Sequence, residues 1–234
     1  ISTPEDISKY ELLLEDGTKL GMNFSYKIQP TPDGLAQAFI LGEEFIGKDN
    51  VCLILGDNIF YGQNFSNILK EASEIKNGAL VFAYHVEDPE NYGVIEFNEK
   101  GKVSNIIEKP KAPNSNYAVT GLYFYDNNVI NFAKNLVPSD RGELEISDIN
   151  LRYLKNNDLE IKMLGRGFAW LDTGNHRSLL DAGIFVQTVE ERQGLKIACL
   201  EEIAFNKKWI SKEDLKRAAK SYEKTEYGKY LNQI

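Results

Sequence analysis

Two aspartates that each follow an apolar run are the residues in this sequence best suited to bind a metal ion. Asp57 comes after residues 51–55 and Gly56, and Asp172 comes directly after residues 168–171. Ligands of open α/β sheets bind beyond the carboxyl ends of the strands, so both carboxylates could converge on one Mg²⁺, a cation that prefers oxygen ligands and suits phosphates. Alternatively, each aspartate only caps the turn that follows it. The residues alone leave both interpretations open.

Two other segments carry groups that could bind a phosphorylated sugar and a planar base. Glu108 and Lys109 end a predicted strand, where the carboxylate could accept hydrogen bonds from sugar hydroxyls and the ammonium group could pair with a phosphate. A surface ion pair, which stabilises little, is the alternative. Residues 29–34, QPTPDG, could present an amide and an uncovered backbone to a base, or form only a proline-stiffened turn. Neither G-x-G-x-x-G nor G-x-x-x-x-G-K-S/T occurs, so neither standard phosphate loop is present.

The composition limits the classes of protein and partner. The chain has 234 residues, of which 42% are hydrophobic and 26% are charged, as is typical of globular proteins. No apolar run reaches the length that spans a membrane. The formal net charge of -8 argues against broad nucleic-acid binding, because there is no surplus of basic residues to displace counterions. The two cysteines form no metal or disulfide pattern, so we expect a cytoplasmic protein without nucleic-acid or membrane partners.

The order of the predicted elements favours an α/β fold. Strands alternate with helices, and the run at 51–55 is continuously apolar, as in parallel sheets covered on both faces. We expect a mostly parallel, Rossmann-like sheet flanked by helices, with a small β-hairpin and a helical C-terminal tail. The expected strands are 22–28, 51–55, 79–86, 93–97, 102–110, 117–126, 159–164 and 168–172, with a strand-like piece at 195–198. The expected helices are 4–15, 35–46, 65–77, 127–136, 143–156, 175–192 and one capped by Ser211 and Asp214.

The first residues predict a helix at the very start of the chain. Thr3 is the expected N-cap, Pro4 the first helical residue and Asp6 the closing residue of a capping box. The sequence contains no internal repeat, low-complexity stretch or linker. Residues 1–234 are therefore expected to form one domain, with 195–234 as its tail.

Eight segments spread over essentially the whole chain carry a family resemblance. They are QPTPDGLAQAF (29–39), LGDNIFYG (55–62), FAYHVEDPENYGV (82–94), EKP (108–110), NYAVTGLYFYD (116–126), RGELEISDIN (141–150), WLDTG (170–174) and EERQGLKIAC (190–199). In this order they resemble the sugar nucleotidyltransferase family, and within it the glucose-1-phosphate thymidylyltransferases. PDGLAQAF with LGDNIFYG and RGELEI indicates thymidylyl rather than uridylyl or adenylyl transfer.

The resemblance implies a reaction. Members of that family join dTTP to α-D-glucose 1-phosphate and release dTDP-glucose and pyrophosphate. The sugar phosphate attacks the α-phosphorus in line, with Mg²⁺ and without a covalent enzyme intermediate, so positioning and electrostatics carry the catalysis. The resemblance also implies a homotetramer, a small hairpin that binds the sugar, and a product used for deoxysugars such as L-rhamnose.

The resemblance also assigns roles to matching positions, with Asp57, Lys109 and Asp172 as the catalytic residues. By motif, Gln29 and Gly34 contact thymine, and Asp57 and Asp172 bind Mg²⁺. The glucose site is formed by Tyr92, Gly93, Glu108 and Val119. Lys109, assisted by Arg141, binds the sugar phosphate, and Trp170 shapes the pocket.

Two departures from the family pattern carry expectations of their own. The family opens with a strand, a glycine-rich loop with an Arg and a Lys-Pro segment, whereas this chain opens with ISTPED, so we expect an N-terminally truncated copy that binds nucleotide poorly and turns over little. In the tail, Leu200 and Asn206 replace residues of a second, regulatory site that some relatives form with Tyr61 and Gly62, which leaves that site in doubt.

Two alternatives to thymidylyl transfer remain open from the sequence. A truncated, non-catalytic module could retain the sugar site and bind sugar nucleotides, which the absent phosphate loop favours. A uridylyltransferase of similar fold is the second alternative. The retained Asp57, Asp172, Glu108 and Lys109 favour an enzyme.

Overall fold

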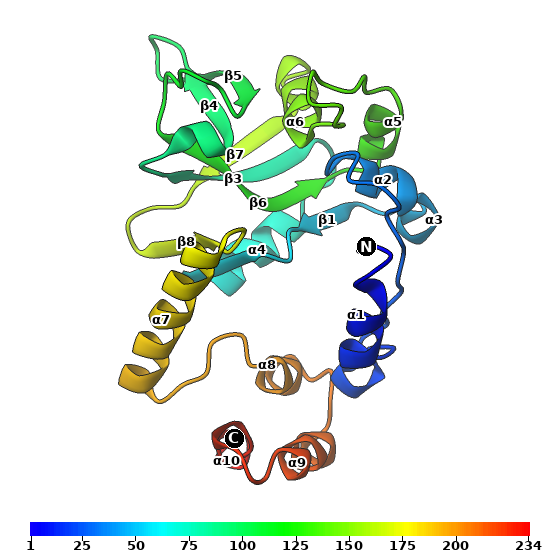
Figure 1. Ribbon diagram of the computed structural model, residues 1–234, viewed down its shortest axis with the longest axis vertical. Coiled ribbons are helices and arrows are strands. Elements are labelled where there is room, and N and C mark those ends of the chain that lie inside the picture. The colour runs from blue at the N-terminus through cyan, green and yellow to red at the C-terminus, as the bar shows by residue number, and fades with distance from the viewer. The chain divides into compact units, whose positions relative to one another are not determined.

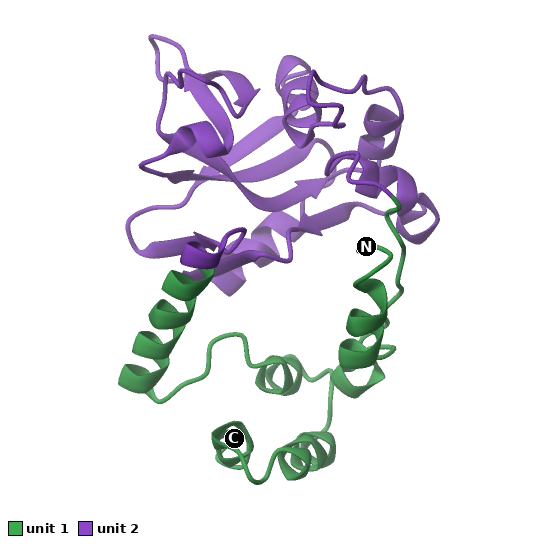
Figure 2. Cartoon of the chain, viewed as in Figure 1, with its two compact units in different colours: residues 1–30, 179–234 green, residues 31–178 purple.

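The computed structural model describes residues 1–234, which form two compact units (Figures 1 and 2). Residues 31–178 make up the larger unit, and residues 1–30 together with 179–234 make up the smaller one. None of the helices combines the length and the apolar character that crossing a membrane requires. All the candidate site residues except Gln29 lie in the larger unit.

The larger unit is built on a six-stranded sheet with β6 (Tyr117–Tyr125) at its centre. β3 (Ala79–His85) pairs along β6 on one edge, and β4 (Gly93–Phe97) and β1 (Val51–Ile54) pair with successive parts of the other edge. The remaining strands complete the order β5-β4-β6-β3-β7, with β5 at Val103–Glu108 and β7 at Leu159–Met163.

Most neighbouring strands run antiparallel, so the expectation of a mostly parallel sheet is corrected to a mixed sheet. Only β3 and β7 pair in parallel, whereas every pair that involves β6 is antiparallel. The apolar run at β1 had predicted a strand that is buried on both faces. In the structure Cys52 and Ile54 are exposed, although their side chains are apolar. A pattern of apolar side chains predicts which residues are buried. It does not predict whether the neighbouring strand runs parallel or antiparallel. The α/β class, the flanking helices and the β4–β5 hairpin are confirmed.

A separate two-stranded sheet pairs β2 (Asn58–Gly62) with β8 (Phe168–Asp172) in antiparallel register. The pattern had predicted β8 but not β2, because residues 58–62 follow a glycine-aspartate turn and look like a loop. Asn58 lies opposite Asp172, and Gly62 lies opposite Phe168. This ribbon links two segments that are far apart in the sequence.

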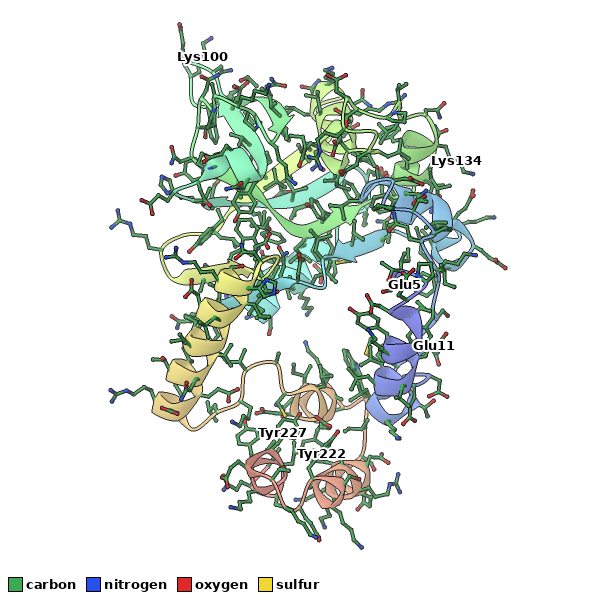
Figure 3. All side chains as sticks on the ribbon, viewed as in Figure 1. Glu5, Glu11, Lys100, Lys134, Tyr222 and Tyr227 are labelled. Carbon is green, nitrogen blue, oxygen red and sulfur yellow. The ribbon has the colours of Figure 1, made fainter.

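Helices of the larger unit cover the two faces of the sheet (Figure 1). Leu80 and Phe82 of β3 pack with α4, while Val81 and Ala83 pack in the cluster that includes α5 and α6. This alternation follows from the two-residue period of a strand. The helices are α2 (Gln37–Leu41), α3 (Glu43–Ile46), α4 (Phe65–Ser73), α5 (Asn128–Lys134) and α6 (Ile146–Lys155), with a 3₁₀ turn at Pro89–Asn91. Lys134 of α5 pairs with Glu43 of α3 at 2.5 Å (Figure 3).

A buried carboxylate ties the end of β6 to its neighbours. Asp126 is 6% exposed and accepts hydrogen bonds from the backbone N–H groups of Gly78 at 2.7 Å and Asn128 at 3.0 Å. The Tyr153 hydroxyl of α6 donates to Asp126 Oδ1 at 2.6 Å. Because an unpaired buried carboxylate is costly, these donors are required for the fold around β6.

The smaller unit is helical. It contains α1 (Ile7–Leu14), a 3₁₀ turn at Thr18–Leu20, most of α7 (His176–Gln193), α8 (Leu200–Asn206), α9 (Lys212–Ser221) and α10 (Glu226–Leu231). Cys199, Leu215 and Tyr230 belong to its own small core. The rings of Tyr222 and Tyr227 meet edge to face at 5.4 Å (Figure 3). The predicted capping box of Ser211 and Asp214 is confirmed.

Several predicted boundaries are wrong for identifiable reasons. Residues 22–28 form no strand, because Ile28 makes only an isolated bridge with Ser2 and no neighbour extends it. Residues 195–198 form no strand either, since the Ile197 N–H donates to the Glu190 side chain at 2.9 Å. The helix expected at 35–46 is interrupted at Gly42. Thr3 accepts from the Asp6 N–H at 3.2 Å, as expected, but regular helix begins at Ile7.

The Asp126 network gives a first testable prediction. Replacing Tyr153 by Phe removes a hydrogen bond to a buried charge, so we expect the free energy of unfolding of the larger unit to fall by about 1.5–3 kcal/mol. Urea denaturation followed by tryptophan fluorescence measures this change. Tyr117→Phe is the matched control, because it also removes one hydroxyl and keeps the ring that meets His85 and Phe97. It should change the free energy by less than about 0.5 kcal/mol. Equal effects of the two substitutions would contradict the prediction.

Candidate functional site

The β2–β8 ribbon brings Asp57 and Asp172 together. Asp57 ends the turn between β1 and β2, and Asp172 is the last residue of β8, opposite Asn58. The N–H and the hydroxyl of Thr173 both donate to the Asp57 carbonyl at 2.8 Å. A strand-pairing register, rather than chance proximity of two loops, therefore sets the position of both aspartates.

Each of the two carboxylates has one oxygen anchored and one oxygen without a protein partner. Asp57 Oδ1 accepts from Asn58 Nδ2 at 2.9 Å, and Asp172 Oδ1 accepts from the Gly174 N–H at 2.8 Å. Neither carboxylate forms an ion pair with a basic side chain. Two nearby carboxylates without a cation suit a hard divalent metal ion. No third histidine, cysteine or acidic residue completes a metal cluster, so further ligands would come from substrate phosphates or water.

Asn58 connects the aspartates to the aromatic residues beside them. Its Oδ1 accepts from the Trp170 indole N–H at 2.7 Å and from the Gly121 N–H of β6 at 3.1 Å. Its Nδ2 holds Asp57, as described above. Trp170 is buried, and its ring lies 5.1 Å from that of Tyr92. Asn58 was not among the residues predicted from the sequence, although its place directly after Gly56 and Asp57 was a signal.

A second group of polar residues lies at the end of the β4–β5 hairpin. Glu108 is opposite Gly93 in the register of the hairpin. Its Oε2 accepts a hydrogen bond from the Ser147 hydroxyl at the start of α6, and its Oε1 lies 3.8 Å from Nη1 of Arg141. A Cβ atom on Gly93 would stand 2.7 Å from Ser147 Oγ, so glycine is needed for this approach. Ser147 was not among the predicted residues.

Burial raises the pKa of Glu108 above its ordinary value, and the nearby negative charge of Glu145 raises it further. The Ser147 hydrogen bond, Lys109 and Arg141 act in the opposite direction. Glu145 is itself buried and accepts from Ser139 Oγ at 2.7 Å. The site therefore holds a carboxylate that protonates more easily than an exposed glutamate.

Arg141 and Lys109 are the two cations of this group, and they differ in their surroundings. Arg141 donates to Glu143 Oε1 at 2.7 Å and lies 3.8 Å from Glu145 Oε1. Lys109 is exposed and forms no ion pair, so the predicted alternative of a Glu108–Lys109 surface pair is wrong. Its N–H donates to the Tyr92 carbonyl at 2.9 Å. Lys109 has a φ of 41° directly before Pro110, a conformation that a residue before proline rarely adopts.

The aromatic residues connect the aspartate pair to the Glu108 group. Tyr92 touches Trp170, and its carbonyl accepts from Lys109. Burial raises the pKa of the Tyr123 hydroxyl, and the charges of Glu108 and Asp57 both raise it further. The structure therefore brings together Asp57, Asp172, Trp170, Tyr92, Gly93, Glu108, Lys109 and Arg141.

Three further predicted residues are placed by contacts of other kinds. Val119 of β6 is 6% exposed and packs in the core. Gly34 has a φ of 102°, and a Cβ atom there would stand 2.4 Å from the Leu144 carbonyl, so glycine allows the 31–36 loop to pack against the segment that carries Arg141. Gln29 belongs to the smaller unit, where its N–H donates to the Ser2 carbonyl at 2.8 Å. Contacts of Gln29 and Gly34 with a base stay predictions.

Comparisons with known proteins show the family to which the chain belongs. The nucleotidyl transferase family model matches residues 1–189. A glucose-1-phosphate thymidylyltransferase of Neisseria meningitidis is 58% identical over 231 residues, which cover 99% of this chain and 80% of the relative. The enzyme of the same name from Mycobacterium tuberculosis is 50% identical over 234 residues, which cover 100% of this chain and 81% of the relative.

A solved structure extends the comparison to three dimensions. A protein of Bacillus anthracis assigned as a glucose-1-phosphate thymidylyltransferase superposes with a TM-score of 0.70 at 41% identity, covering 78% of this chain and 73% of that chain. The family model covers most of the chain, and the relatives match nearly all of it. The chain therefore belongs to the nucleotidyl transferase family.

Proposed function

We propose that this chain joins dTTP to α-D-glucose 1-phosphate and releases dTDP-glucose and pyrophosphate. The observation that carries the proposal is the convergence of Asp57 and Asp172, each with one unpaired oxygen. Through Trp170 and Tyr92 this pair is connected to an exposed lysine and a half-buried glutamate. Nucleotidyl transferases generally use a divalent metal ion, and we assign Mg²⁺ because its ligands here are carboxylates and phosphates. The names of the similar proteins support the choice of substrates.

In the proposed reaction, an oxygen of the sugar phosphate attacks the α-phosphorus of dTTP in line. The new phosphorus–oxygen bond forms as the bond to the β-phosphate oxygen breaks, and pyrophosphate leaves with that electron pair. When bound between Asp57 and Asp172, Mg²⁺ supplies positive charge to the α-phosphate. Lys109 and Arg141 hold the sugar phosphate, whose negative charge would otherwise oppose the approach to dTTP. No covalent intermediate with the enzyme is required.

The remaining residues are assigned to recognition of the two substrates. Glu108 accepts hydrogen bonds from glucose hydroxyls, with Tyr92, Gly93 and Val119 around the sugar. The Gln29 amide and the backbone of Gly34 contact thymine. Trp170 shapes the pocket, because its indole is fixed to Asn58 and packs on Tyr92.

Four wider assignments accompany this function. We treat residues 1–234 as one nucleotidyltransferase domain with a tail at 195–234, which is supported by a family match that starts in the smaller unit and spans the larger one. We assign a homotetramer and a cytoplasmic location, the latter supported by two free cysteines. The product would enter deoxysugar synthesis. Whether the tail with Leu200 and Asn206 forms a regulatory site stays an open prediction.

Pyrophosphate release from dTTP and glucose 1-phosphate tests the function directly. The assay uses the 234-residue chain and the longest reading frame of its gene, with Mg²⁺. We expect Asp57→Asn and Asp172→Asn to lower kcat/KM by about 10²–10³-fold, because each removes charge that stabilises the transferring phosphate through the metal. Asp49→Asn is the matched control, since Asp49 is exposed and its side chain makes no hydrogen bond or ion pair.

The same assay distinguishes the alternatives. Release that survives both substitutions would contradict the assigned roles of the aspartates. A folded protein that binds dTDP-glucose but releases no pyrophosphate in either form would identify a non-catalytic binding module. Competition between dTTP and UTP separates a thymidylyl enzyme, which should prefer dTTP, from a uridylyl enzyme.

The pKa of Glu108 predicts a pH dependence of sugar binding. If ionised Glu108 accepts the glucose hydroxyls, kcat/KM for glucose 1-phosphate falls as the pH drops through the raised pKa of this carboxyl. Ser147→Ala removes a hydrogen bond that lowers this pKa, so the acid limb of the profile should move to higher pH. Ser104→Ala, which removes an exposed hydroxyl bonded to the Glu96 carbonyl, is the control. An acid limb that stays in place or moves to lower pH in Ser147→Ala would contradict the assignment.

A further inference from the structure

The turn after β8 places a glycine directly beside the two aspartates. Gly174 is exposed, and its N–H donates to Asp172 Oδ1 at 2.8 Å. A Cβ atom at this position would stand 2.9 Å from Asp172 Oδ1 and 3.6 Å from Asp57 Oδ2. A single methyl group here would therefore touch both carboxylates.

We propose that Gly174 is a positioning residue that keeps the Asp172 carboxylate turned toward Asp57, so that both aspartates can hold one divalent cation. The inference rests on the proposed function, because it assumes that the metal binds between these side chains. It concerns a residue to which the proposed function assigns no contact with the sugar or the base. Gly174 leaves space for the Asp172 carboxylate, and its N–H donates a hydrogen bond to that carboxylate.

The distances around Gly174 indicate which atoms would move if a larger residue replaced it. Gly174 is not among the residues with positive φ, so its backbone conformation is open to any amino acid. A distance of 2.9 Å is too short for a Cβ contact, and the atom it meets is the end of a side chain rather than backbone. The least costly response to Ala is that Asp172 rotates away and loses the Gly174 N–H bond. The fold is retained, while the orientation of one metal ligand is lost.

Gly56 provides a matched control on the other side of the site. It precedes Asp57 in the chain, as Gly174 follows Asp172 after one intervening residue. A Cβ atom on Gly56 would meet nothing within 4 Å. Gly56→Ala therefore adds the same methyl group next to the other aspartate without forcing either carboxylate to move.

The test is a titration of the protein with Mn²⁺, followed by electron paramagnetic resonance of the free ion, without substrates. We expect Gly174→Ala to raise the Kd of Mn²⁺ at least about tenfold, since it disorients one of two protein ligands. Gly56→Ala should leave the Kd of Mn²⁺ within about twofold of the parent value, because the added methyl group contacts neither carboxylate. Gly174→Ala with parental affinity would overturn the inference.

Asp57→Asn separates this inference from the proposed function. One outcome is that the parent binds Mn²⁺, that Asp57→Asn abolishes this binding and that Gly174→Ala retains it. In that case the metal assignment stands and the proposed role of Gly174 is wrong. If Asp57→Asn leaves Mn²⁺ binding unchanged, the aspartate pair does not hold the metal, and both the metal assignment and the role of Gly174 are overturned.

A double-mutant cycle keeps the inference testable even if Gly174→Ala lowers stability. The melting temperatures of Gly174→Ala, Asp172→Ala and the double variant are compared with that of the parent. If the methyl group acts through the Asp172 carboxylate, Gly174→Ala lowers the melting temperature of the parent but not that of Asp172→Ala. An equal decrease in both backgrounds would mean that Gly174 supports the backbone and not the carboxylate, and would overturn the inference.

Discussion

The pairing register of β2 and β8 is the constraint on which the candidate site depends. This register sets Asn58 opposite Asp172, which places Asp57 and Asp172 side by side although more than a hundred residues separate them. A slip by one residue would turn alternate side chains to the opposite face of the ribbon and separate the carboxylates. Asn58 fixes the ribbon further, because one amide side chain holds Asp57, the Trp170 indole and the backbone of β6. The two aspartates, the Trp170 indole and the main sheet are thus connected through a single residue.

The two ends of the site differ in how their charges are arranged. At the aspartate pair, like charges lie together without a protein cation, which leaves room for a metal ion and phosphates. At the hairpin end, Glu108, Glu143 and Glu145 surround Arg141, and burial makes Glu108 easier to protonate. Lys109, also at the hairpin end, is an exposed cation in an uncommon backbone conformation. A phosphorylated sugar fits this distribution of charge, since its hydroxyls suit a carboxylate and its phosphate suits the two cations.

Local sequence patterns predicted the positions of strands better than the pairings that connect the strands. The end of β8 at Asp172 was predicted, and the end of β5 at Glu108 lies two residues before the predicted end at 110, because apolar runs and polar breaks are local signals. The antiparallel neighbours of β6 and the short strand β2 were missed, because pairing direction and register depend on residues distant in the sequence. The supporting residues Asn58 and Ser147 were missed for the same reason, since their partners Trp170 and Glu108 are close only in the folded chain. Residues 22–28 show the reverse error, in which an alternating pattern lacks a neighbouring strand to pair with.

The position of the metal ion tests the central claim most directly. Crystals grown with Mn²⁺ and a non-hydrolysable dTTP analogue would locate the ion by its anomalous scattering. The structure predicts one peak within coordination distance of Asp57 and Asp172, with the α-phosphate as a further ligand. A peak bound elsewhere, or the same peak retained after Asp57 and Asp172 are both replaced by Asn, would contradict the account.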